Sequence, residues 1–188
     1  MAEALILGSS SPFRRKVLED AGIPFYVISP DIDEKKIRGE NHALTPVLLS
    51  FAKAEAVLKK VTFPGIIIAC DQVVLCNGAL FEKPESARDI RDWYEIFFQY
   101  PLQYVNGFTA LNTTTRQSVT AQEVSVVKLS RIPPTVIDTQ VRNTTAYQCA
   151  GGITDEIENE YATIVSGTRD SLRGLPVPFV MDLVDQVR

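Results

Sequence analysis

The first third of the chain contains blocks of apolar residues that predict strands, separated by stretches with helical spacing. The apolar block 4–8 predicts a buried strand, residues 12–21 an amphipathic helix, and residues 25–29 a second strand. A longer amphipathic pattern, with a proline in its first turn, predicts a helix over 45–60. These elements alternate as strand, helix, strand and helix.

The middle of the chain contains its longest apolar run. Residues 65–70 are uniformly apolar, which predicts a central strand buried on both faces and ending at Asp71. Two short apolar segments, 73–76 and 79–81, flank the dipeptide Asn77-Gly78, which favours a two-residue hairpin turn. This part of the sheet is therefore expected to be antiparallel.

The remaining pattern predicts further strands and helices without internal repeats. We expect helices over 86–98, 133–141 and 176–187, and strands over 104–112, 119–129 and 161–166. Strands and helices do not alternate strictly, so the predicted fold is α/β, with a mixed, largely antiparallel sheet flanked by helices. We expect residues 1–188 to form a single domain.

Composition and charge exclude several classes of protein. Three cysteines at unrelated spacings, Cys70, Cys76 and Cys149, predict neither a disulfide framework nor a paired-thiolate zinc site. A net charge of −4 argues against a nucleic-acid polymer as partner. The N-terminal residues lack a signal-peptide pattern and no apolar run is long enough to span a membrane, so we expect a cytoplasmic location.

The segment that follows the first strand is suited to binding an anion. Ser9, Ser10 and Ser11 precede the predicted helix, and Arg14 and Arg15 lie in its first turns. Backbone N–H groups, hydroxyls and guanidinium groups there would converge on a phosphate chain. The alternative is a capped helix whose basic side chains are solvated.

Two acidic and two basic positions could add chemistry to this segment. Asp71, at the end of the buried strand, is the best candidate for a general base, although it could instead cap a turn. Glu34 could be a second acid, or a solvated residue of an acidic loop. Two carboxylates beside a phosphate chain would suit Mg²⁺ or Mn²⁺, and Lys53 and Lys83 could neutralise charge on the phosphates.

Common nucleotide-binding and nucleophilic motifs are absent from the sequence. It contains neither a Walker-type loop nor a dinucleotide glycine fingerprint. The single histidine, His42, lies in a polar segment without a serine or cysteine elbow, so we expect it to be solvated.

Seven segments, taken together, resemble the Maf family of nucleoside triphosphate pyrophosphatases, once described as septum-formation inhibitors. They occur in the family's order and spacing over nearly the whole chain: Ser9 to Arg15, Pro30 to Glu34, Ala52-Lys53-Ala54, Asp71-Gln72-Val73, Lys83-Pro84, Cys149-Ala150-Gly151 and Gly174-Leu175-Pro176.

The resemblance implies a fold, a reaction and partners. The fold would be an elongated sheet with two lobes around a central cleft, similar to inosine triphosphate pyrophosphatase. The reaction would be hydrolysis of a nucleoside triphosphate between its α- and β-phosphates, with a divalent cation, Mg²⁺ or Mn²⁺. Family members often form homodimers, so a homodimer is a further expectation.

The resemblance also implies roles for individual residues. Asp71 would be the proton acceptor, and Lys53 and Lys83 would be catalytic residues that hold the phosphates. Glu34 and Asp71 would hold the metal. The phosphate-binding residues would be Ser9, Ser11, Arg14 and Arg15.

Within the family, the chain is most similar to the branch that acts on 7-methyl-GTP. Phe13, Gln72 and Glu156 match the residue types that distinguish this branch from the one acting on dTTP and UTP. An aromatic face at Phe13 and a carboxylate at Glu156 would both favour the positively charged 7-methylguanine base. Alternatively, Phe13 packs in the core and Glu156 belongs to an exposed acidic run. The glycines that usually follow this glutamate are absent here.

Two rival functions remain open from the sequence. One keeps the same chemistry and changes the substrate to dTTP or UTP. The other is a regulator of septation that binds nucleotide without turnover. The leading hypothesis is a house-cleaning pyrophosphatase that removes 7-methyl-GTP from the nucleotide pool.

Overall fold

The computed structural model describes residues 3–37 and 41–188, and the chain divides into two compact units. The first unit comprises Met1–Asp71, Asn106–Glu123 and Asp170–Arg188. The second comprises Gln72–Val105 and Val124–Arg169. Among the described residues, none of the helices is both long enough and apolar enough to cross a membrane.

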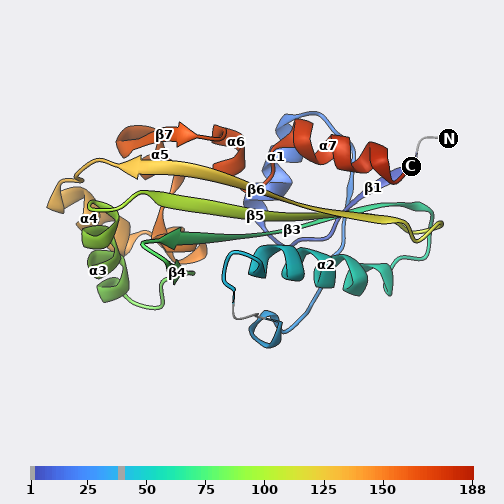
Figure 1. The fold of residues 1–188 in the computed structure, drawn as a ribbon, viewed down its shortest axis with the longest axis horizontal. Coiled ribbons are helices and arrows are strands. Elements are labelled where there is room, and N and C mark those ends of the chain that lie inside the picture. The colour runs from blue at the N-terminus through green and yellow to red at the C-terminus, as the bar shows by residue number, and fades with distance from the viewer. Residues whose placement is uncertain (1–2, 38–40) are drawn as a thin grey trace. The chain divides into compact units, whose positions relative to one another are not determined.

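The predicted helices and strands occur in the predicted order, with five further short helices between them (Figure 1). In the first unit they are β1 (Ala4–Leu7), α1 (Pro12–Asp20), β2 (Tyr26–Val27), the 3₁₀ helix η1 (Glu34–Lys36), α2 (Thr45–Leu58) and α7 (Val177–Gln186). In the second unit they are β4 (Ala79–Phe81), α3 (Ala87–Phe97), α4 (Pro134–Arg142), η2 (Ala146–Gln148), η3 (Ala150–Gly152), α5 (Asp155–Tyr161) and β7 (Ala162–Ser166). Four elements have residues in both units: β3 (Gly65–Cys76), β5 (Leu102–Asn112), β6 (Ser118–Leu129) and α6 (Arg169–Leu172).

The strands form a mixed sheet, as the sequence predicts. Their order among the described residues is β2-β1-β3-β5-β6-β7, with β4 paired to β3 outside this path. Strand β1 pairs in parallel with β2 and β3, whereas β3–β4 and β6–β7 are antiparallel pairs. The prediction of an α/β fold with a mixed sheet flanked by helices is therefore confirmed.

In the first unit, helices cover both faces of the sheet. Leu5 and Leu7 of β1 pack in a cluster with residues of α1 and α7, while Ile6 packs with Ala54 and Val57 of α2. Figure 1 shows the same arrangement, with α2 on one face of these strands and α1 and α7 on the other. Because side chains alternate along a strand, β1 contributes to both layers.

The same alternation along β3 decides to which face of the sheet the side chain of Asp71 points. Ile66, Ile68 and Cys70 belong to the α1 and α7 side, whereas Ile67 and Ala69 belong to the α2 side. Asp71 has the parity of Ile67 and Ala69, so its side chain emerges on the face that α2 covers.

Helix α2 lies unusually close to strand β5. A Cβ atom added at Gly107 would lie 2.2 Å from both the backbone carbon and the backbone oxygen of Pro46, so no larger residue fits there. Farther along the helix, the hydroxyls of Ser50 and Thr109 lie 2.9 Å apart, and Thr109 lies 3.1 Å from Thr120 of β6. This buried chain of hydroxyls, together with the close approach at Gly107, fixes α2 against the sheet.

In the second unit, aromatic rings pack around helix α3. Phe81 makes edge-to-face contacts with Trp93 and Phe97, and the buried hydroxyl of Tyr94 donates to the carbonyl of Gly152. Ser86 begins α3 with a capping box, in which its hydroxyl accepts from the backbone N–H of Asp89.

The structure differs from the predicted elements in strand β3 and in five short helices that the sequence did not predict, η1, η2, η3, α5 and α6. Gly65–Cys76 is one continuous strand, so Asp71 lies within β3 rather than at the end of a strand. The turn at Asn77-Gly78 occurs as predicted, with φ of 48° and 78°. Helix α5 was not predicted; three acidic residues in its first turn favour a helix through the helix dipole.

Candidate active site

Arg14 links the start of helix α1 to the strand that carries Asp71. Its Nη1 donates to the backbone oxygen of Cys70 at 2.7 Å and to the hydroxyl of Ser9 at 3.4 Å. The Ser9 hydroxyl also accepts from the backbone N–H of Ser11 at 3.2 Å. The guanidinium group therefore binds the carbonyl of the peptide bond that joins Cys70 to Asp71. Its Nε and Nη2 make no hydrogen bond to the described part of the chain.

Lys53 of α2 forms a buried ion pair with Asp71. Its Nζ lies 2.6 Å from Oδ1 of Asp71, and the two side chains are 8% and 11% exposed. Oδ2 of Asp71 has no hydrogen-bond partner among the described residues, so it can accept a proton from water. Removing one partner of such a buried pair generally costs about 3–5 kcal/mol, because the other charge is left without compensation.

Glu34, the last residue of the acidic segment 30–34, contacts the same lysine. Its Oε1 lies 2.8 Å from Nζ of Lys53, and its side chain is half-exposed. The two carboxylate oxygens therefore lie no farther apart than the sum of their two distances to one nitrogen. Since Glu34 begins η1, the 3₁₀ helix presents its carboxylate towards α2.

The two carboxylates fit the donor set of a divalent cation that also binds phosphate. Mg²⁺ commonly uses one or two carboxylates and completes its shell with water and phosphate oxygens. A site made by protein side chains alone needs more ligands, and no group of three or more acidic, histidine or cysteine side chains suited to a metal occurs among the described residues. Asp71 and Glu34 therefore suit a cation whose remaining ligands are water molecules or phosphate oxygens.

Arg14, Lys53 and Asp71 form a cluster of charges at the middle of β3, and all three charges act on the thiol of Cys70. Burial raises the pKa of this thiol, while the charges of Arg14 and Lys53 act in the opposite direction and that of Asp71 adds to the rise. The thiol points to the α1 and α7 side of the sheet, so only its backbone carbonyl takes part in the cluster.

Three other residues predicted for this segment occupy different environments. Ser11 lies at the N-cap of α1 but its side chain makes no capping hydrogen bond, while its backbone N–H bonds to Ser9. Arg15 forms an exposed ion pair with Glu19 at 2.9 Å on the outer face of α1, away from Arg14. Phe13 is half-buried.

The remaining predicted site residues belong to the second unit. Lys83 is exposed in the segment between β4 and α3, and Gln72 is the half-buried neighbour of Asp71 in β3. Glu156 is exposed in the first turn of α5, where its carboxylate accepts from Nε2 of Gln140 at 3.4 Å. Their roles stay predictions.

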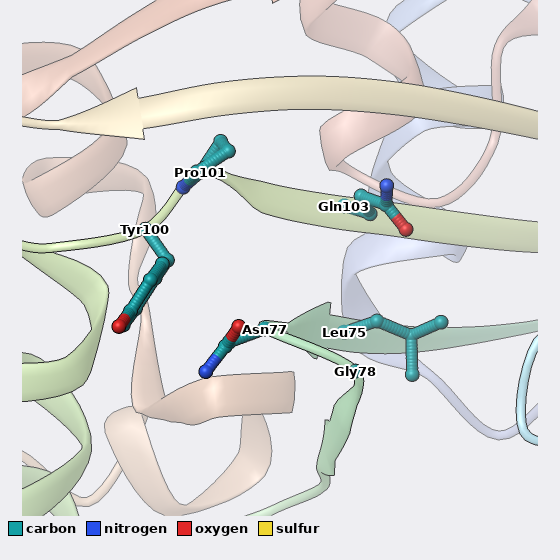
Figure 2. A pocket seen from close by; sticks show the side chains of 6 residues that line it. All are labelled: Leu75, Asn77, Gly78, Tyr100, Pro101 and Gln103. Carbon is teal, nitrogen blue, oxygen red and sulfur yellow. The ribbon is translucent and has the colours of Figure 1, made fainter.

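Two further features do not belong to the cluster. His42 is exposed in a turn before α2, as expected for a solvated histidine. A surface hollow of about 250 Å³ in the second unit is lined by Leu75, Asn77, Gly78, Tyr100, Pro101 and Gln103 (Figure 2). It contains none of the predicted site residues.

Sequence reasoning missed one pair beside the cluster. Asp31 and Lys60 lie 2.5 Å apart at the other end of the segment that carries Glu34. A signal was available, because Lys60 follows Lys53 by seven residues, which is about two helical turns.

The cluster combines the groups that phosphoanhydride hydrolysis requires. A guanidinium group with free N–H donors can bind phosphate oxygens, a lysine can offset developing charge, and a carboxylate can accept a proton. All of them come from the first unit and surround the middle of β3.

Comparison with known proteins agrees with this chemistry. Residues 4–187 match the family model described as Maf-like protein. A protein of Dictyostelium discoideum named 7-methyl-GTP pyrophosphatase is 33% identical, over 97% of this chain and 96% of its own length. Proteins of the same name are 30% identical in Idiomarina loihiensis, over 98% and 94%, and in Pseudomonas syringae, over 96% and 95%.

The chain is also similar to solved structures. One of them is a nucleoside-triphosphatase, or dITP/XTP pyrophosphatase, from Mycobacterium abscessus, with a TM-score of 0.40 and 14% sequence identity. The match covers 69% of this chain and 74% of that one.

Proposed function

Because this chain belongs to the Maf family of nucleoside triphosphate pyrophosphatases, we propose that it hydrolyses 7-methyl-GTP to 7-methyl-GMP and diphosphate. In this proposal residues 1–188 act as one pyrophosphatase domain. The observation that supports the chemistry best is that Lys53 contacts the carboxylates of both Asp71 and Glu34. Arg14 donates to the carbonyl of Cys70, the residue just before Asp71. The names of relatives at about one-third identity support the substrate.

In the proposed reaction, Asp71 activates water. Oδ2 accepts a proton as the water oxygen bonds to the α-phosphorus, and the bond from that phosphorus to the bridging oxygen breaks. The bond's electron pair leaves with the diphosphate. Lys53 fixes the orientation of the Asp71 carboxylate through Oδ1, which leaves Oδ2 directed at the water.

The other residues of the cluster bind the triphosphate. Arg14 is held by Ser9 and the carbonyl of Cys70, so its free N–H donors are oriented before a phosphate arrives. Asp71 and Glu34 would hold a Mg²⁺ or Mn²⁺ ion. When bound, such an ion neutralises phosphate charge and polarises the phosphoryl group.

An assay of products and substrates tests the proposal. Purified protein with Mg²⁺ or Mn²⁺ is supplied with 7-methyl-GTP, GTP, dTTP and UTP, and diphosphate and orthophosphate are measured separately. We expect diphosphate as the first product and the fastest turnover with 7-methyl-GTP; GTP is the matched control, since it lacks only the methyl group. Orthophosphate as the first product would contradict cleavage between the α- and β-phosphates.

Exchange of two residues tests the choice of base. The methylated base is positively charged, so Phe13 can contribute a cation–π interaction of about 1 kcal/mol, and Glu156 can balance the charge. Phe13→Arg combined with Glu156→Gln should therefore shift the ratio of kcat/KM values towards dTTP and UTP. An unchanged ranking of the four nucleotides would show that other residues recognise the base.

A further inference from the structure

From the contacts around the acidic segment, we infer that Asp31 and Lys60 are positioning residues that hold Glu34 in place for the proposed reaction. This inference rests on the proposed function, because it concerns the role given there to Glu34. Asp31 and Lys60 themselves lie outside the cluster of Arg14, Lys53 and Asp71.

A compact set of hydrogen bonds joins Asp31 to the end of helix α2. Nζ of Lys60 donates to Oδ2 of Asp31 at 2.5 Å and to the backbone oxygen of Ser29 at 2.8 Å. The hydroxyl of Ser29 donates to the other carboxylate oxygen of Asp31 at 2.6 Å. Both oxygens of the carboxylate and the chain before it are therefore held, which distinguishes this group from a single surface ion pair.

The charges and the backbone favour the same arrangement. The hydrogen bonds from Lys60 and then Ser29 lower the pKa of Asp31 below its ordinary value, so the carboxylate stays ionised at neutral pH. Asp31 has a φ of 48°, in the left-handed region, where aspartate and asparagine are tolerated better than most residues. The chain changes direction at this point and then runs back along α2.

The segment between the two contacts is short. Lys53 lies in α2, and Lys60 lies two residues past the end of that helix, in a turn where its backbone N–H bonds to the carbonyl of Val57. Along the direction of the helix the two lysines are therefore about 10 Å apart. Asp31 and Glu34 are three residues apart, and three extended residues span about 10 Å at most. With Asp31 bonded to Lys60 and Glu34 bonded to Lys53, the segment runs antiparallel to α2 and is held at both ends.

The contact between Lys60 and Asp31 can therefore affect the position of Glu34, although Lys60 lies about two helical turns from Lys53. Release of Asp31 would let the segment move away from α2 and would give the half-exposed carboxylate of Glu34 more freedom. The expected effect is weaker binding of a divalent cation. The base, Asp71, lies on β3 and would keep its contact with Lys53.

Two variants and their combination test the inference. Asp31→Asn removes the charge and retains a residue that accepts a positive φ, and Lys60→Met removes the ammonium group while keeping most of the chain length. Asp92→Asn is the matched control, because Asp92 forms an exposed ion pair with Arg88 on α3 in the second unit. Glu34→Gln is the reference for direct loss of a ligand.

Two readouts do not depend on turnover. Hydrogen exchange, measured by mass spectrometry, reports the protection of residues 29–37. Loss of the free-ion EPR signal reports binding of Mn²⁺ added alone. In both single variants we expect faster exchange in 29–37 and a Mn²⁺ dissociation constant raised about two- to five-fold, the range of an exposed ion pair. The double variant should equal a single one, since both changes break the same contact.

The outcomes separate this inference from the proposed function. Wild-type exchange in 29–37, or wild-type Mn²⁺ binding in both single variants, would overturn the positioning role even if the enzyme hydrolyses 7-methyl-GTP. Additive effects in the double variant would overturn it as well. If Glu34→Gln bound Mn²⁺ as the wild type does, the role of Glu34 in the proposed function would fail instead.

Discussion

At the scale of single residues, the alternation of side chains along β3 decides where the candidate base, Asp71, lies. Asp71 has the same parity in β3 as Ile67 and Ala69, so its side chain meets α2, where Lys53 is buried. An aspartate one position earlier or later would point to the layer of α1 and α7 instead. The alternation of the strand, rather than its end, therefore brings a carboxylate and an ammonium group together.

The first prediction concerns Asp71. Asp71→Asn keeps the size of the side chain and removes its capacity to accept a proton, so we expect kcat to fall by about 10²- to 10⁴-fold, the usual contribution of a general base. Binding of 7-methyl-GMP, measured by calorimetry, should change little because Ser9 and Arg14 are intact. Turnover close to that of the wild type would exclude Asp71 as the proton acceptor.

At the scale of elements, helix α2 connects the parts of the cluster. It carries Lys53, packs against the sheet through Ala54 and Val57, and is held at its start by the close approach to Gly107. Its hydroxyl contact from Ser50 to Thr109 lies about one turn before Lys53. The position of the lysine is therefore set by the packing of a whole helix.

The second prediction concerns that packing. Gly107→Ala would place a methyl group within 2.2 Å of the Pro46 backbone, so α2 must shift or the protein must lose stability. We expect a loss of about 1–3 kcal/mol in the free energy of unfolding, as for other overpacked sites, measured by urea denaturation. Gln103→Ala, at an exposed position of the same strand, is the control and should change stability by less than about 0.5 kcal/mol. Equal stability of the two variants would contradict the role of Gly107.

At the scale of the whole molecule, the two units differ in the charges that they bury. The first buries an ion pair, Lys53 with Asp71. The second buries the carboxylate of Glu158 near neutral groups that can ionise in alkali: desolvation raises the pKa of the half-buried Cys149 to about 12, and it raises the pKa of the buried Tyr94 and Tyr104 as well. The carboxylate of Glu158 adds to all three shifts.

The third prediction is the response of stability to alkaline pH. Above pH 9, the ordinary pKa of a cysteine, the unfolded chain loses the Cys149 proton while the folded chain retains it, so stability falls as pH rises. We expect the free energy of unfolding to fall by about 1–2 kcal/mol between pH 9 and about pH 10.5 from this group, measured by urea denaturation. Cys149→Ala should reduce the slope. A slope identical to that of the wild type would show that Cys149 does not contribute.

Much of the fold could be predicted from the sequence because its signals are local. The apolar runs, the turn at Asn77-Gly78 and the first-turn proline of α2 each act over a few residues, and the corresponding elements appear. Helix α5 was not recognised because its packing, with Ile157 and Glu158 buried, depends on distant residues. The predicted central cleft between two lobes and the roles of Lys83, Gln72 and Glu156 stay predictions.

The sequence by itself determined the residue types of the site, the order of the elements and the family, since these depend on the chain alone. Only the tertiary structure decided which of the basic residues meet the acids. Arg14 and Arg15 are neighbours in sequence, yet helical geometry directs one to the Cys70 carbonyl and the other to Glu19. Likewise, the Lys53–Asp71 and Lys60–Asp31 contacts join residues far apart in the chain, and such pairings are set by the packing of α2.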